Sequence, residues 1–269
     1  MNKLKIAVPD NKYYERLYKN SNEFIEIIPV KEEKIITLMV TNRVDGALLN
    51  PLSYGIIRNN LDIRVVNSHC LSAVGFTNLS KVLFKSDIKR IKSIGARNPN
   101  LYLSIMSKIM LAERYGIELD ITETDKEAEG ILDEFDTAII LDENYSNPSS
   151  IDLTENWSDS YSQVFPIAMW CLRSDIDLNN FSQVFDDLYD NTCPINEKIT
   201  EENSKNENVS YGRREGELIW KWDKLMEEAC DNVLEILYYH QYISEIYDIK
   251  MYGESDNMEG NEEADTQKP

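Results

Sequence analysis

Short apolar runs of strand length alternate along this chain with stretches whose apolar residues recur at helical spacing. The first strands are predicted over 3–8 and 26–30, and a helix is predicted over 33–41. A buried strand over 47–49 ends at Asn50, because the proline that follows breaks a strand and favours the start of a helix. Further strands are predicted over 61–66, 71–77, 93–96, 118–122 and 137–141, and further helices over 99–115, 126–135, 181–189 and 218–247. This order of elements predicts an α/β fold with a mostly parallel sheet.

Two longer apolar runs, NLSKVLFKSD at 78–87 and VFPIAMWCLRSD at 164–175, each end in charged residues. They bracket a middle segment, 88–163, that has strand and helix signals of its own. A chain that leaves one lobe near residue 84 and returns near residue 170 forms two lobes with a cleft between them. We therefore expect an α/β clamshell with two crossover strands, in which lobe I comprises 1–84 with 171–250 and lobe II comprises 85–170.

The charge of the chain limits its partners. Of its 269 residues, 48 are acidic and 28 are basic, so the formal net charge is -20. This charge opposes binding to nucleic acid or to an anionic membrane surface, and neither is an expected partner. The residues after Met1 include no apolar run long enough for a signal peptide, and no stretch of about 20 apolar residues occurs anywhere. We therefore expect a cytoplasmic protein.

Two segments are too polar to contribute to a core. Residues 196–208 are predicted as a flexible insertion, and residues 253–269 as a disordered acidic tail.

Neither a metal nor a cofactor is expected. The four cysteines are scattered without a C-x-x-C pair, and the two histidines lie far apart. The chain contains no G-x-S-x-G, P-loop or G-x-G-x-x-G pattern, which argues against serine hydrolases, nucleotide triphosphatases and dinucleotide enzymes.

Polar residues gather where three of the predicted strands end, at 9–11, 50–54 and 98–102. In open α/β sheets, ligands bind at the carboxyl ends of strands, so these loops are expected to line the cleft. Two of the loops lead into helices, whose free N–H groups favour an anion, and a small anionic ligand is the expected partner. The candidate residues are Asn11, Asn50, Pro51, Ser53, Tyr54, Asn98, Asn100 and Tyr102.

Several of the candidates also have a purely structural explanation. Asn50 and Asn98 are equally well explained as helix caps, and Tyr54 and Tyr102 as core residues. Arg97 could hold a ligand carboxylate, or it could pair with Asp120 or another acid on the surface. Asp142, which follows a predicted strand, is a further candidate for ligand contact.

Over roughly residues 3–190, the chain resembles the chorismate dehydratase family of menaquinone biosynthesis (the futalosine pathway). The similar segments include VDGALLNPLSY at 44–54, GFTNLSKVLFKSDIKRIKSIGARNPNLYLSIMSKIMLAERYG at 75–116, and DTAIILDE at 136–143. The most specific similarity is IDLTENWSDSYSQVFPIAMWCLR at 151–173, in which the Asp-Leu-x-x-x-Trp pattern is in register. The resemblance implies a type II periplasmic-binding-protein-like fold.

The resemblance also implies a lyase that removes water from chorismate to form 3-[(1-carboxyvinyl)oxy]benzoate without a cofactor. In that case Asn11, Asn98 and Asn100 are the candidate catalytic donors that orient the substrate. The chain has PDN where the family has a Ser-Tyr-Leu-Asn loop, and it lacks the family's hydroxyl residues before the 99–115 helix. The alternative is therefore a non-catalytic binding protein for a small carboxylate or other anion.

Overall fold

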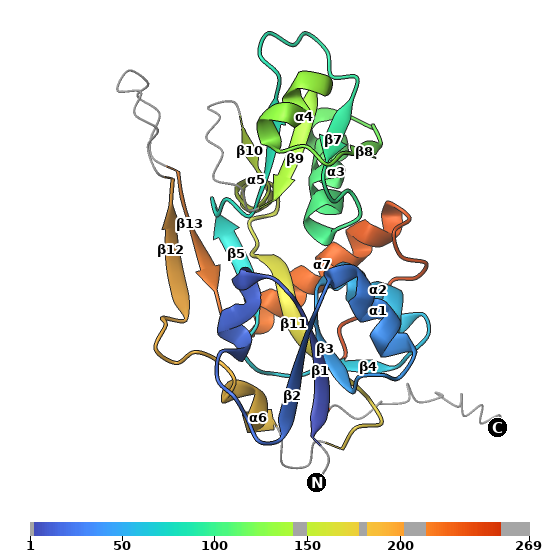
Figure 1. The fold of residues 1–269 in the computed structure, drawn as a ribbon, viewed down its shortest axis with the longest axis vertical. Helices are drawn as coiled ribbons and strands as arrows, with labels where there is room; N and C mark the ends of the chain where they lie inside the picture. The colour runs from blue at the N-terminus through green and yellow to red at the C-terminus, as the bar shows by residue number, and fades with distance from the viewer. Residues whose placement is uncertain (1–2, 142–149, 178–181, 202–213, 254–269) are drawn as a thin grey trace, which may run out of the picture.

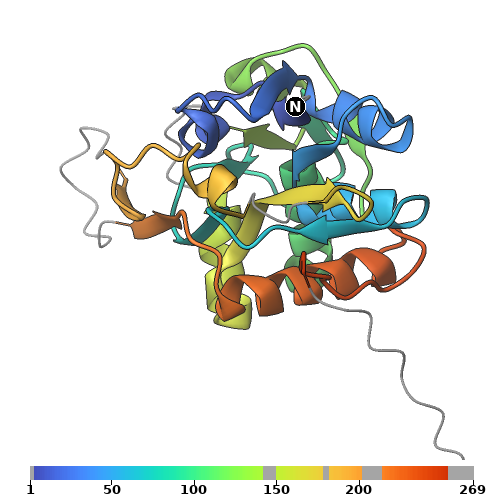
Figure 2. The same ribbon diagram turned by 90° about the horizontal axis from the view of Figure 1, so that it is seen from below.

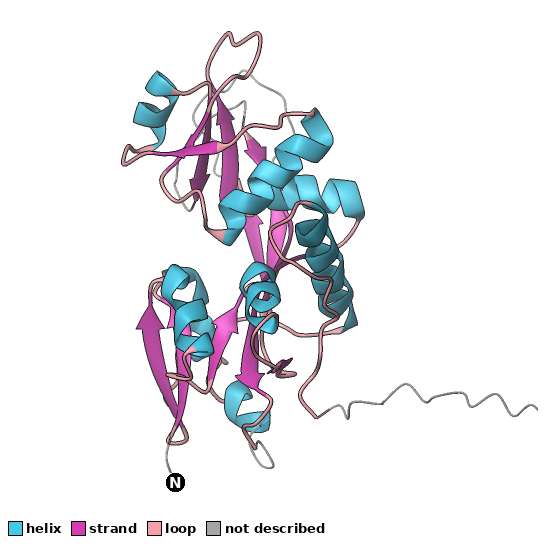
Figure 3. Cartoon of the chain, turned by 90° about the vertical axis from the view of Figure 1, so that its right-hand side faces the viewer, coloured by secondary structure: helices cyan, strands magenta, loops and turns pink. Residues whose placement is uncertain are grey.

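A computed structural model describes residues 3–141, 150–177, 182–201 and 214–253. Two lobes stand one above the other, each built on its own mixed sheet (Figures 1 and 3). Among the described residues, no helix has the length and apolar character needed to cross a membrane.

Lobe I contains a sheet in the order β12-β13-β5-β11-β3-β1-β2, with β4 also paired to β11. Its strands are β1 (Leu4–Pro9), β2 (Ile25–Val30), β3 (Gly46–Leu49), β4 (Ile63–Val65), β5 (Leu71–Gly75), β11 (Phe165–Arg173), β12 (Asn196–Thr200) and β13 (Glu215–Ile219). Its helices are the 3-10 helix η1 (Lys12–Tyr18), α1 (Glu32–Val40), α2 (Pro51–Arg58), α6 (Ser182–Asp186) and α7 (Lys224–Tyr239). Helices α2 and α7 pack together against β11, and α7 runs along one side of the sheet (Figure 2).

Lobe II contains a smaller sheet in the order β10-β6-β9-β7-β8. Its strands are β6 (Ser80–Phe84), β7 (Ile94–Ala96), β8 (Ile121–Glu123), β9 (Thr137–Leu141) and β10 (Ile151–Asp152). The described helices of this lobe are α3 (Tyr102–Tyr115), α4 (Ala128–Glu134) and α5 (Leu153–Tyr161).

The core follows the apolar runs of the sequence. All of β11 except Arg173 is buried, which explains why its sequence is continuously apolar rather than alternating. Trp170, at the centre of this strand, packs against Phe185 of α6 with ring centroids 5.3 Å apart. Three of the cysteines are also buried, as expected for small apolar side chains.

The sheets are less parallel than the sequence predicts. Strand β1 pairs in parallel with β2 and β3, but β11 pairs antiparallel with β3, β4 and β5. The prediction of a mostly parallel sheet is therefore wrong, because the strand that returns from lobe II enters the larger sheet in the opposite direction.

Both passages between the lobes lie earlier in the chain than predicted. The chain changes sheets between β5 and β6 rather than near residue 84, and it returns before β11 rather than near residue 170. At the first passage, Gly75 and Asn78 have positive φ angles of 67° and 64°, and the chain bends at both residues. The apolar pattern of the sequence continues through these bends and therefore does not mark them. The whole of β6 thus belongs to lobe II and the whole of β11 to lobe I.

The first passage is bonded to lobe II at the N-terminus of α5. The Thr154 hydroxyl donates to the Gly75 carbonyl at 2.7 Å and lies 2.7 Å from the Thr77 hydroxyl. The buried Asp152 carboxylate accepts from the backbone N–H of Asn78 at 2.8 Å and caps α5 through Thr154 and Glu155. These bonds define the hinge network, which comprises Gly75, Thr77, Asn78, Asp152 and Thr154.

The C-terminal part of lobe I also differs from the sequence prediction. Residues 196–200, predicted within a flexible insertion, form strand β12, which pairs with β13. Residues 218–219, predicted as helical, belong to β13, because helix α7 begins only after Asp223 accepts from the Met226 N–H. The remainder of the predicted insertion, residues 202–208, lies outside the described residues, as does the predicted tail from residue 254 onward.

Candidate functional site

The site lies between the two lobes, in a cavity of about 360 Å³. Helix α3 lies on the side of lobe II next to lobe I (Figure 1), and its N-terminal end forms part of one wall of the cavity. The loop after β1 and the start of α1 contribute residues of lobe I to the same cavity. The lining residues are Asn11, Tyr13, Tyr14, Glu32, Arg97, Asn98, Leu101, Tyr102, Leu103, Glu127 and Leu141.

Glu32 is the acid that links the lobes within this cavity. It lies in the first turn of α1, and its carboxylate accepts from the Asn50 side-chain amide at 2.7 Å. The backbone N–H of Tyr102, the first residue of α3, lies near the same carboxyl group from lobe II. Burial, reinforced by the nearby Glu33 charge, raises the pKa of Glu32 to about 7, although the Tyr102 N–H and the Asn50 amide act in the opposite direction.

Asn11 and Asn98 both line the cavity, one from each lobe. The Asn11 side chain accepts from the Tyr13 N–H at 3.1 Å and so caps the 3-10 helix η1. Asn98, however, does not cap α3, although its position before Pro99 in the sequence is typical of a helix cap. Residues 98–101 form a separate turn, and the helix begins after Leu101, which has an extended backbone and no side-chain cap.

Arg97 is the basic residue of the cavity lining, and it is already paired. Its guanidinium lies 3.0 Å from the carboxylate of Glu127, which lines the same cavity. Asp120, the pairing partner considered from the sequence, instead accepts from Lys108 at 2.7 Å. The pair of Arg97 and Glu127 contributes no net charge to the cavity.

The 50–54 candidates are turned toward the core of lobe I rather than toward the cavity. Asn50 caps α2 by accepting from the Ser53 N–H at 2.8 Å, and Pro51 occupies the first helical turn. Tyr54 is fully buried, and its hydroxyl donates to the Asp248 carbonyl at 3.3 Å. Asn50 therefore acts on the cavity only through its bond to Glu32.

The remaining candidates from the sequence are Tyr102, Asn100 and Asp142. The Tyr102 ring is buried against Phe165 and its hydroxyl donates to the Pro166 carbonyl at 2.8 Å, so it supports the junction of the lobes. Asn100 is exposed and is not among the residues that line the cavity. Asp142 lies outside the described residues.

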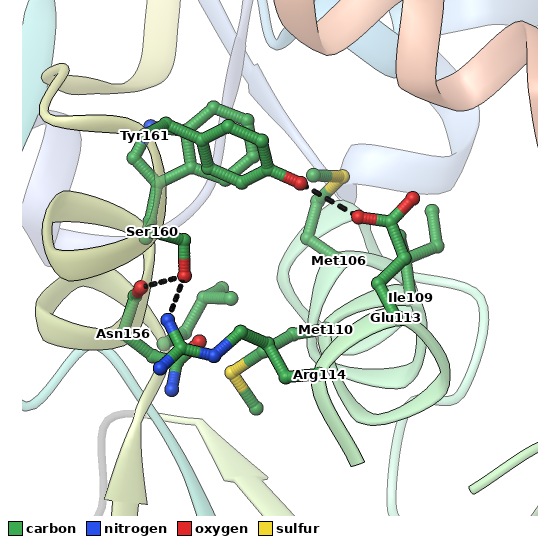
Figure 4. Close-up of a pocket in the computed structure, with 10 residues that line it drawn as sticks. Met106, Ile109, Met110, Glu113, Arg114, Asn156, Ser160 and Tyr161 are labelled. Carbon is green, nitrogen blue, oxygen red and sulfur yellow. Dashed lines mark hydrogen bonds between the residues drawn. The ribbon is translucent and has the colours of Figure 1, made fainter. Parts of the chain in front are cut away.

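A second pocket, between α3 and α5, is too small to be a ligand site (Figure 4). Its cavity of about 20 Å³ approaches the size of a single water molecule. Two contacts cross it: the Tyr161 hydroxyl donates to Glu113 at 2.6 Å, and Arg114 donates to Ser160. The rest of the lining is mostly apolar and includes Met106, Met110 and Trp157, so the pocket is a packing seam within lobe II.

Sequence reasoning missed Glu32, Glu127, Tyr13 and Tyr14. The aromatic pair at 13–14, directly after the first strand-end loop, was the available signal for the tyrosines. Nothing comparable marked the two acids, because Glu32 and Glu127 belong to charged clusters typical of exposed helix starts. Only the packing of the lobes encloses Glu32.

Comparison with known proteins identifies the fold. No family model matches the chain, and no curated protein matches it in sequence. Among solved structures, the periplasmic aliphatic sulphonate binding protein SsuA from Escherichia coli is similar over 98% of this chain and 99% of its own, with a TM-score of 0.50 and 11% identity. Protein AF1704 from Archaeoglobus fulgidus is similar over 66% of this chain and 70% of its own, with a TM-score of 0.50 and 15% identity. The chain has a two-lobed, periplasmic-binding-protein-like α/β fold, as predicted.

Proposed function

We propose that this protein binds a small molecule in the cavity between its lobes. The observation that carries the proposal is that one cavity is lined by residues of both lobes, including Asn11 and Glu32 from one and Asn98 from the other. Its volume of about 360 Å³ lies within the range of small-molecule sites. A ligand held by both lobes stabilises the closed arrangement by its binding free energy.

The cavity offers several kinds of contact to such a ligand. Asn11 and Asn98 supply amides that both donate and accept, while Tyr13 and Tyr14 supply aromatic surface. Asn11 follows strand β1 and Asn98 lies in the turn before α3, the positions where α/β folds hold their ligands, and the two tyrosines lie in η1, which follows Asn11. The contacts suit a polar molecule with an apolar body.

The first test is a thermal-shift screen of small metabolites, followed by calorimetric titration of each compound that raises the melting temperature. Asn98→Ala is expected to weaken the binding of such a compound about tenfold, because one or two hydrogen bonds are lost. Asn100→Ala is the matched control, since Asn100 lies outside the cavity lining, and it should bind normally. Equal affinity for both variants would place the ligand elsewhere.

The second candidate function is chorismate dehydration. Its support is that Asn11 and Asn98, two of the donors implied by the family resemblance, line the same cavity. In this reading, the amides hold the substrate while a ring proton and the ring hydroxyl leave, and aromatisation drives the reaction. Asn100 would have no part in it.

The dehydratase is tested by incubating the purified protein with chorismate and following the aromatic enolpyruvyl ether by NMR. If the activity is present, Asn11→Ala and Asn98→Ala should each reduce turnover at least about a hundredfold, while Asn100→Ala leaves it unchanged. Absence of product at high protein concentration rejects this candidate and leaves the binding proposal in place.

A further inference from the structure

The Glu32 carboxyl group lines the cavity and is held by a group that could have bound an anion. The side-chain amide of Asn50, the residue that caps α2, donates to this carboxylate at 2.7 Å. The backbone N–H of Tyr102, at the start of α3, lies near enough to the same carboxyl group to lower its pKa. The polar groups on this side of the cavity therefore already face a negatively charged side chain of the protein.

From this arrangement we infer that the cavity selects ligands that carry a cationic group, an ammonium or an amidinium, with Glu32 as the counter-ion. The inference rests on the proposed function, since it names the class of molecule that the same cavity binds. A cationic ligand takes the place of the small anionic ligand that the sequence predicts from the loops at the strand ends. That prediction did not take Glu32 into account, because Glu32 does not lie in any of these loops.

The charges of the lining favour a cation over an anion. Arg97, the basic lining residue, is neutralised by Glu127, so an entering anion meets the uncompensated Glu32. A carboxylate has about four lone-pair sites, and the bond from Asn50 leaves room for further donors. The net charge of -20 on the whole chain likewise attracts cations toward the cleft.

The aromatic residues of the lining fit the same class of ligand. Tyr13 and Tyr14 stand nearly at right angles, with an interplanar angle of 81° and ring centroids 6.5 Å apart. The face of a tyrosine ring attracts a cation, and this attraction strengthens when water is excluded. A carboxylate with adjacent tyrosine rings is a combination that recognises organic ammonium groups.

The test compares two probes of similar size that share a phenyl ring, benzylamine and benzoate, in NMR titrations of the wild-type protein at about pH 8, where Glu32 is ionised. Benzylamine should bind at least about tenfold more tightly than benzoate. Glu32→Gln keeps an acceptor oxygen for the Asn50 amide but removes the charge, so it should abolish this preference.

Glu33→Gln is the matched control, because it removes the same charge from the next residue, which does not line the cavity. It should leave the preference for benzylamine unchanged. A wild-type preference for benzoate, or binding of neither probe, overturns the inference. Because benzylamine and benzoate are first compared on the wild-type protein, this result does not depend on whether a variant folds. The thermal-shift screen of metabolites tests the proposed function separately.

Discussion

Gly216→Ala is expected to lower the free energy of unfolding by about 3 kcal/mol or more, because the new methyl group has no space. Gly216 lies in β13 opposite Gly75 of β5. A Cβ atom at this position would lie 2.3 Å from the Phe76 carbonyl oxygen and 2.5 Å from that of Val74. Both oxygens belong to the backbone, so β13 must move away from β5. Denaturant titration followed by circular dichroism measures the loss.

Gly130→Ala is the matched control for this substitution. Gly130 lies inside α4, and a Cβ there would approach only the flexible side chain of Lys126, at 3.3 Å. Alanine favours a helix interior over glycine by roughly 0.5–1 kcal/mol, so this variant should be slightly more stable than the wild type. Wild-type stability of Gly216→Ala would contradict the close pairing of β5 and β13.

Asp152→Ala is expected to cost roughly 3 kcal/mol and to loosen the connection between the lobes. The Asp152 carboxylate is fully buried and accepts from the backbone N–H groups of Asn78, Thr154 and Glu155 at 2.8–3.0 Å. Alanine leaves these donors without their acceptor, both on the first passage and in the first turn of α5. Thermal denaturation gives the stability loss, and hydrogen exchange at Asn78 reports the hinge directly.

Two further variants test whether the stability loss comes from the hinge network or from the removal of any negative charge. Asp159→Ala removes an exposed acid from the same helix and should change stability by less than about 0.5 kcal/mol. Asp152→Asn retains an acceptor oxygen, and burial already raises the pKa of Asp152, so this variant should be milder than alanine. If Asp152→Ala unfolds like Asp159→Ala, the hinge network contributes nothing to stability.

Local patterns predicted the elements whose signals are confined to a few residues. Asn50 and the proline after it marked the start of α2, and Gly116 marked the end of α3 with a positive φ of 64°. The continuous apolar run at 164–172 marked the buried β11. In each case the physical cause, a cap, a left-handed turn or full burial, lies within the segment itself.

Patterns that depend on distant partners were predicted less well. Residues 196–200 are as polar as a loop, and only their pairing with β13 makes them a strand at the edge of the sheet. The α3 start was placed at Asn98 because a proline follows, whereas the chain makes another turn first. The site was recovered only in part for the same reason: Asn11, Arg97 and Asn98 follow strand ends, but Glu32 is enclosed only when α1 meets α3.

The passages between the lobes also determine the order in which a growing chain can fold. The described strands of lobe II lie between residues 80 and 152, so its sheet can pair while the later strands of lobe I are still being made. Lobe I must wait for β11, which pairs with β3, β4 and β5, and then for β13 and for Met251, which bridges to Val65. Lobe I therefore contains strands that are made before lobe II, but it completes its sheet after lobe II, and the wall that it gives to the cavity is fixed last.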